Sequence, residues 1–262
     1  MNSVADAARR VLTAADPNEK VKAARQAARA WRQGKLAHSF DAAMPDVPAR
    51  PALPELLPPN RMPKRGKGGS ERGRLALLHA LAHIEFVAMH LAFDMAARFG
   101  AGFPRDFVDD WFSVGADEAM HFAILDRRLR ALGSFYGALP AHAGLWEAAS
   151  ATAHDPLARL AVVPMALEAR GLDVTPVTVE RFRMSGDETS ARVLERIYND
   201  EIRHVRFGTK WFDAGCKDKG LIPAAHWQSL IGTHFRGVVK GPFNDSARDS
   251  AGLTREYYAA IA

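Results

Sequence analysis

The sequence of 262 residues contains a single cysteine, Cys216. One thiol cannot form an internal disulfide, and a cysteine-ligated metal site or iron–sulfur cluster needs several thiolates. We therefore expect a reducing, cytoplasmic location. The first 17 residues lack the apolar core of a signal peptide, and the chain contains no visible flavin or nucleotide motif. A redox reaction in this protein would therefore need a separate electron donor.

Alternation of apolar and polar residues typical of strands is also absent, whereas helix-forming Ala, Leu, Arg and Glu are plentiful. This composition predicts an all-α fold with a four-helix core. The apolar run 75–97 is long enough to cross a bilayer, but it contains Glu85, Asp94 and three histidines. Ionisable groups are costly in lipid. We therefore predict a buried core helix and no membrane partner.

Turn residues divide the chain into segments of helical periodicity. The four long helices are expected at 71–99, 105–132, 156–171 and 187–215, and shorter ones near 4–36, 142–153, 176–184 and 223–235. The run "GLDVTP" is expected to end the third long helix. We predict three regions: an N-terminal helical arm with a Pro-rich connection at 1–69, the bundle at 70–216, and a C-terminal helix and tail at 217–262.

Two similar runs lie on the second and fourth long helices: "DEAMH" at 117–121 and "DEIRH" at 200–204. In each run, the Glu and the His fall on the apolar stripe of their helix, where a core-facing helix normally has Leu or Val. A buried carboxylate without a partner is unfavourable. Because both helices place these groups in the same way, one shared site is indicated.

The first and third long helices each add one inward glutamate, Glu85 and Glu168. Glu85 precedes Glu118 by 33 residues, and Glu168 precedes Glu201 by the same interval. The chain therefore contains two helical hairpins, each with the pattern Glu…Glu-x-x-His. A pair of such hairpins related by a pseudo-two-fold axis would place four carboxylates and two imidazoles in one core.

Four carboxylates in a dry core would repel one another, and two divalent cations would neutralise them. This arrangement is that of ferritin-like di-iron and di-manganese proteins. The sequence thus predicts a dinuclear metal site with six ligands: Glu85, Glu118, His121, Glu168, Glu201 and His204. Either Glu118 and Glu201 or Glu85 and Glu168 would bridge the metals. The alternative is a set of polar core helices whose acids are satisfied by ion pairs.

The phrases "LAHIEFVA", "ADEAMHF", "LEARGLDVTP" and "DEIRHVRFGTKWF" carry a family resemblance over about residues 71–215. The chain resembles the ferritin-like superfamily, and within it an uncharacterised bacterial branch known as a domain of unknown function. That branch is distantly similar to the di-iron hydroxylase that modifies tRNA side chains. The resemblance implies a ferritin-like four-helix bundle with extra terminal helices, two iron ions (or manganese, or one of each), oxygen chemistry, and a homodimer.

Three neighbouring residues are expected to support the ligands. A metal-bound histidine usually donates its other N–H to a carboxylate, which makes Asp117 and Asp200 candidate partners of the two ligand histidines. The run "DEIRH" resembles the Asp-Glu-x-Arg-His run of di-iron monooxygenases, which places Arg203 beside them. The alternative is that both aspartates are ordinary acids on the helix surface.

Other notable residues are expected to be structural. His79, His83 and His90 lie on roughly the opposite side of their helix from Glu85, which favours packing or surface roles over metal binding. Tyr198, one turn before Glu201, is expected to pack in the core rather than relay protons or radicals. Pro164 removes a backbone donor and should kink the third long helix.

This set of carboxylate and imidazole candidate ligands favours a non-haem di-iron or di-manganese oxidoreductase that activates O₂. Such a protein would be a hydroxylase or oxidase of a small or tethered organic substrate. Iron oxidation and storage or peroxide defence, as in ferritins and rubrerythrins, is the first alternative. The second is a tRNA-modifying hydroxylase or an RNA-binding protein, suggested by the basic segment 61–74 and the net charge of +5.

Overall fold

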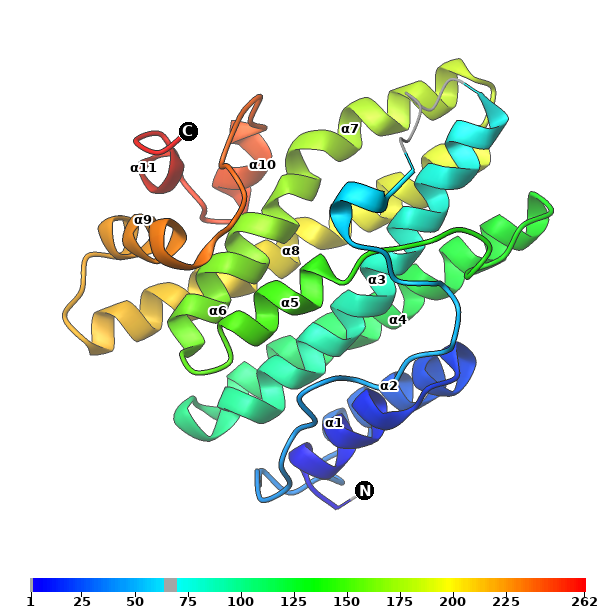
Figure 1. The fold of residues 1–262 in the computed structure, drawn as a ribbon. Coiled ribbons are helices and arrows are strands. Elements are labelled where there is room, and N and C mark those ends of the chain that lie inside the picture. The colour runs from blue at the N-terminus through cyan, green and yellow to red at the C-terminus, as the bar shows by residue number, and fades with distance from the viewer. Residues whose placement is uncertain (1, 64–69) are drawn as a thin grey trace. The chain divides into compact units, whose positions relative to one another are not determined.

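A computed structural model describes residues 2–63 and 70–262 and shows an all-helical protein (Figure 1). Within the described residues, extended pairing is limited to two isolated bridges, Ser3 with Ala37 and Leu56 with Ala141. The predicted all-α class is therefore confirmed. The chain forms two compact units, residues 1–146 and 147–262. The three predicted regions at 1–69, 70–216 and 217–262 stay predictions.

The first unit contains a long helical hairpin covered by two shorter helices. The helices are α1 (Val4–Thr13), α2 (Pro17–Arg32), α3 (Glu71–Phe99) and α4 (Arg105–Ala131), and α5 (Gly144–Ala151) begins at the end of this unit. Asp16 caps α2 by accepting hydrogen bonds from the backbone N–H groups of Asn18 and Glu19, and Pro17 occupies the first turn. The expected break between two N-terminal helices is therefore confirmed.

The helix α3 is long and apolar enough to cross a membrane, as judged by length and composition over residues 71–102. However, 67% of its most apolar window is buried inside the protein. The core helix of a globular fold has the same character, as the sequence predicts. Among the described residues, there is thus no clear membrane signal.

The second unit contains the other long hairpin and the C-terminal helices. Its elements are α6 (Pro156–Val162), a π-helical segment η3 (Val163–Glu168), α7 (Ala169–Met184), α8 (Glu188–Asp218), α9 (Pro223–His234), α10 (Asp245–Ser250) and α11 (Arg255–Tyr258). The helix is interrupted at Pro164, as predicted, because proline lacks the N–H that an α-helix requires. The backbone N–H of Ala169 donates instead to the Pro164 carbonyl, five residues earlier. Glu168 is the last residue of this π segment.

The prediction that the third long helix ends at residue 171 is wrong, as is the separate helix at 176–184. The helix α7 runs unbroken from Ala169 to Met184 and contains Pro176 in its interior. Proline at that position leaves the carbonyl of Leu172 without its helical donor. The side-chain amide of Asn244 donates to that carbonyl at 3.1 Å. A residue of the C-terminal tail therefore supplies the missing hydrogen bond.

Hydrogen bonds join the C-terminal tail that contains Asn244 to α7 and α8. Arg248 donates two hydrogen bonds to Asp173 of α7, at 2.8 and 2.7 Å, and both residues are buried. Asn244 also donates to the hydroxyl of Tyr198 on α8 at 2.9 Å. Tyr198 is half-buried, and its hydroxyl accepts a hydrogen bond from the C-terminal tail. The sequence predicted only core packing for this residue. The short helix α10 is capped by this same Asn244.

The crossing of α8 and the π segment depends on a glycine. An added Cβ at Gly208 would lie 2.6 Å from the Cβ of Pro164, closer than real Cβ contacts allow. We expect Gly208→Ala to lower the free energy of unfolding by about 1–3 kcal/mol. The control is Gly171→Ala on α7, where a new Cβ meets nothing within 4 Å, so that alanine should be neutral or stabilise by up to about 1 kcal/mol. Urea unfolding of both variants tests the pair, and equal effects would contradict this packing.

The basic segment 61–74 falls partly on residues 64–69, which lie outside the described residues. The RNA-binding hypothesis attached to that segment therefore stays a prediction.

Candidate metal centre

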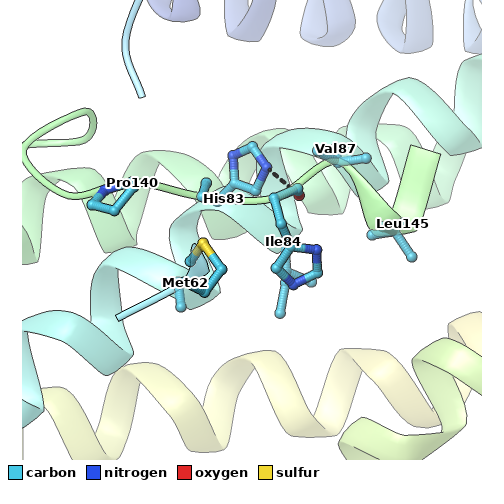
Figure 2. A pocket seen from close by; sticks show the side chains of 9 residues that line it. Met62, His83, Ile84, Val87, Pro140 and Leu145 are labelled. Carbon is cyan, nitrogen blue, oxygen red and sulfur yellow. Dashed lines mark hydrogen bonds between the residues drawn. The ribbon is translucent and has the colours of Figure 1, made fainter. Parts of the chain in front are cut away.

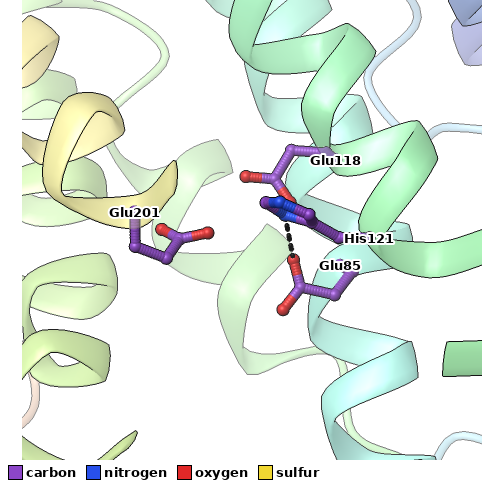
Figure 3. Close-up of side chains that lie close together, drawn as sticks. All are labelled: Glu85, Glu118, His121 and Glu201. Carbon is purple, nitrogen blue, oxygen red and sulfur yellow. Dashed lines mark hydrogen bonds and ion pairs between the residues drawn. The ribbon is translucent and has the colours of Figure 1, made fainter. Parts of the chain in front are cut away.

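The first unit brings together three of the six predicted ligands. Glu85 extends from α3, and Glu118 and His121 extend from α4, one helical turn apart. One ligand atom of each lies within 4.8 Å of those of the other two. The Nδ1 atom of His121 is 3.4 Å from Oε2 of Glu85 and 3.4 Å from Oε2 of Glu118. Figure 3 shows these three side chains converging.

All three side chains are buried: Glu85 is 5% exposed, Glu118 1% and His121 0%. Burial, and after it the neighbouring charge of Glu118, raise the pKa of Glu85 well above its usual range. The buried carboxyl group of Glu85 thus favours retaining its proton, and a bound cation would remove that preference. This buried Glu/His group could bind a metal ion.

The second unit repeats half of this arrangement on α8. The Nδ1 atom of His204 is 3.3 Å from Oε1 of Glu201, close to the corresponding separation of 3.4 Å between His121 and Glu118. His204 is completely buried, and the side chain of Glu201 is 13% exposed. The repeated Glu-x-x-His run therefore has the same local geometry in both units.

Glu168, the remaining predicted ligand, is half-buried at the end of the π segment. Its predicted membership of the ligand set stays a prediction. A π-helical turn is frequent at functional sites because it shifts the side chains that follow it relative to a regular helix.

The predicted supporting residues have the following surroundings. Asp200 is buried and pairs with Arg196 at 2.8 Å, and its other oxygen lies 4.0 Å from the exposed Arg203. Asp117 is half-buried on α4. The predicted roles of Asp117 and Asp200 as partners of the ligand histidines stay predictions, as does the placement of Arg203 beside the metal ligands.

His79 and His83, two histidines of α3, have packing roles, as expected. The Nε2 atom of His79 accepts a hydrogen bond from the backbone N–H of Gly137 at 2.9 Å. His83 contacts the hydroxyl of Tyr136 and the carbonyl of His142. Both imidazoles therefore hold the segment that follows α4 against α3. The sequence could not indicate these pairs, since their partners lie more than 50 residues away in a segment without periodicity.

Burial lowers the pKa of His79 to about 4. In the unfolded chain, the imidazole takes up its proton near pH 6.5. The contribution of His79 to stability is therefore complete above about pH 6.5 and is lost as the pH falls towards 4, by at most about 1.4 kcal/mol per pH unit. We expect His79→Gln, which keeps an acceptor for Gly137, to make the unfolding free energy less steep in this range. The exposed His154→Gln should leave the slope unchanged, and equal slopes in all three proteins would refute this role.

A cavity of about 50 Å³ lies beside the turns of α3 that surround Glu85 (Figure 2). Such a volume holds a few water-sized groups. The lining is mostly apolar, with His83 and His142 as its polar members; it includes Met62, Ile84, Val87 and Leu145. The cavity thus provides a small, mostly apolar space on the side of α3 where the histidine-bound segment lies.

The fold and these side chains define a class: an all-α protein with a buried carboxylate and imidazole group that could bind a metal ion. The chain belongs to the family described as "Protein of unknown function (DUF455)", whose model matches residues 13–259. A protein of Haemophilus influenzae described as "Uncharacterized protein" is 42% identical over 216 residues, which cover 80% of this chain and 75% of that relative. No solved structure matches the chain significantly. The sequence-based assignment to a domain of unknown function is thereby confirmed.

Proposed function

We propose that this protein is a non-haem dinuclear metal oxidoreductase, built on a ferritin-like four-helix bundle, that uses O₂ to hydroxylate or oxidise an organic substrate in the cytoplasm. Iron is the proposed metal, with manganese as its substitute. The observation that carries the proposal is the buried group of Glu85, Glu118 and His121, in which two carboxyl groups and one imidazole converge.

The donor set fits such a metal. Carboxylate and imidazole ligands suit iron and manganese, whereas soft metals favour thiolates. The raised pKa of Glu85 also fits, because the same burial and repulsion that favour its proton would favour a divalent cation in its place. We propose that Glu168, Glu201 and His204 complete the set. The support for this step is the equal 33-residue spacing in the two hairpins and the matching Glu–His separations of 3.4 and 3.3 Å.

The residues have distinct tasks in this proposal. The carboxylates would hold the metals and neutralise their charge, and His121 and His204 would each supply one nitrogen ligand. The apolar side chains around them exclude water, which strengthens electrostatic interactions within the site. Bound ferrous ions would supply the electrons that reduce O₂. A separate donor protein would restore those electrons.

The test is the reaction of the purified, metal-free protein with Fe(II) in air. We expect about two iron ions per chain and a rapid burst of oxygen uptake that stops at that stoichiometry. Continued iron uptake with mineral formation would instead indicate storage. A chain that binds no iron, manganese or other divalent metal with all six residues intact would refute the proposal.

A further inference from the structure

Close contacts fix how the two long arms of the second unit lie along each other. One arm consists of α6, the π segment and α7, and the other is α8, which runs back along the first after the turn at 185–187. An added Cβ at Gly215 would lie 2.7 Å from Cδ2 of Leu157. One at Gly208 would lie 2.6 Å from Cβ of Pro164. Seven residues forward on the first arm therefore match seven residues back on α8, as an antiparallel pair requires.

The same register brings the proposed ligands of the second unit to one level. Glu168 lies four residues after Pro164, and His204 lies four residues before Gly208. Residues four apart share a face of a helix, and four residues advance about 6 Å along its axis. Glu168 and His204 are therefore level with each other, with Glu201 in the adjacent turn of α8. We call these three residues the second half-site.

A side chain of the C-terminal tail joins the two arms one turn further along. The amide nitrogen of Asn244 donates to the carbonyl of Leu172 on α7, at 3.1 Å, and to the hydroxyl of Tyr198 on α8, at 2.9 Å. We call this pair of hydrogen bonds the Asn244 bridge. Leu172 lies four residues after Glu168, and Tyr198 lies three residues before Glu201. The second half-site is therefore held from two sides, by the glycine–proline contact and by the Asn244 bridge.

The side chain of Asn244 has a partner for each of its polar groups. A side-chain amide offers two N–H groups and one oxygen. The two N–H groups serve the two arms, and the oxygen accepts a hydrogen bond from the backbone N–H of Ala247, which caps α10. The backbone N–H of Asn244 donates to Asp173 at 3.0 Å, and Asp173 also pairs with the buried Arg248 of the tail. These contacts together fix the orientation of the bridging amide.

The arm that bears Glu168 needs such support because two prolines interrupt its hydrogen bonds. Pro164, in the π segment, lacks the N–H that an α-helix requires. Pro176 leaves the carbonyl of Leu172 without its helical donor. Glu168 lies between these two interruptions, so the helix alone does not fix its position. Contacts with α8 and with the tail supply the remaining constraint.

We infer that Asn244 is a positioning residue for the metal site, which keeps Glu168 level with the Glu-x-x-His run of α8 so that the second half-site can bind an ion. The inference rests on the proposed function. Asn244 acts through the backbone of α7 and the Tyr198 hydroxyl of α8. Residues that orient ligands indirectly typically change metal affinity by about 10–100-fold. The three candidate ligands of the first unit lie on α3 and α4, and the affinity of their ion should not depend on Asn244.

The experiment titrates the full-length, metal-free protein with Mn(II) and follows the free ion by electron paramagnetic resonance. Asn244→Ser keeps an oxygen that can cap α10, but its single, shorter donor cannot join the two arms. We expect the wild type to bind about two ions per chain. The variant should bind the first ion with unchanged affinity and the second about tenfold or more weakly. The spin coupling between two neighbouring bound Mn(II) ions should be lost with the second ion.

The matched control is another side-chain amide of the second unit that donates two hydrogen bonds. The amide nitrogen of Gln228 donates to the carbonyls of Glu256 and Tyr257, at 3.0 and 3.1 Å, and so joins α9 to α11. Gln228→Ser therefore removes the same kind of contact away from the two arms, and it should bind both ions like the wild type. If Gln228→Ser weakens the second ion as much as Asn244→Ser does, the bridge only supports the fold and the inference is overturned. Equal weakening of both ions in Asn244→Ser would overturn it in the same way.

Tyr198→Phe cuts the Asn244 bridge on the α8 side and leaves the carbonyl of Leu172 with its donor. It should also weaken binding of the second ion, and it decides the question if Asn244→Ser does not fold. Because both substitutions break one bridge, the double variant should bind the second ion no more weakly than Asn244→Ser. Wild-type affinity for the second ion in either single variant overturns the inference and leaves the proposed function standing. A wild-type chain that binds no metal overturns both, because there is then no site to position.

Discussion

Glu118→Gln should abolish the thermal stabilisation that divalent metal gives to this protein. At a metal concentration 100-fold above Kd, binding stabilises the wild-type chain by about 2.7 kcal/mol, which raises Tm by about 5–10 °C for a protein of this size. Loss of a direct carboxylate ligand should weaken binding more than the 10–100-fold that is typical of residues one step further from a metal. Differential scanning calorimetry with and without Mn(II) would measure this.

The same substitution should not destabilise the metal-free protein. Glu118 and Glu85 are both buried, and the charge of Glu118 raises the pKa of Glu85. A neutral amide at position 118 relieves that repulsion. Metal-free Glu118→Gln should therefore unfold at the wild-type temperature or above it. Asp106→Asn, an exposed site on the same helix, should leave the metal response intact. A large loss of stability in metal-free Glu118→Gln would mean that the carboxylate belongs to a structural ion-pair network.

Glu201→Ala should remove at least one of the two bound metals while the helices survive. Glu201 is the carboxylate beside His204 on α8, and the rest of that helix keeps its buried apolar side chains. Metal analysis after saturation and desalting should fall from about two ions per chain to one or none. Circular dichroism should report unchanged helix content.

The matched control for that variant is Glu195→Ala. Glu195 is on the same helix, but its carboxylate is 43% exposed and pairs with Arg183. Surface pairs of this kind contribute about 0–1 kcal/mol, and Glu195 is not among the predicted ligands. Metal content should therefore be unchanged in Glu195→Ala. Equal metal content in both variants would exclude Glu201 from the site.

The candidate ligands on α3 and α4 could be predicted because they violate a local pattern. A glutamate and a histidine at helical spacing on an apolar stripe can be recognised from the sequence of their own helix, without knowledge of the residues that pack against it. The structure brings Glu85, Glu118 and His121 together as that pattern indicates. The partner of His83 could not be found in this way. Tyr136 follows α4 in a segment without periodicity, and its hydrogen bond to His83 spans 53 residues.

Some helix boundaries are likewise set by residues next to them in the sequence, and others by residues far away in the sequence. The caps at Asp16 and Asp187 are local signals, and the helices α2 and α8 begin there. Pro176 is also a local signal, but the expectation that it ends a helix is wrong because Asn244 supplies a donor from 68 residues away. A helix can thus continue through a proline when a tertiary contact donates a hydrogen bond to the carbonyl that the proline leaves without a donor.

The most direct test of the central claim is anomalous diffraction at the iron absorption edge from crystals of the Fe(II)-loaded wild-type protein. We predict two peaks about 4 Å apart, one bound by Glu85, Glu118 and His121 and the other by Glu168, Glu201 and His204. Crystals that contain iron by fluorescence but show no peak at Glu85, Glu118 and His121 would contradict the account.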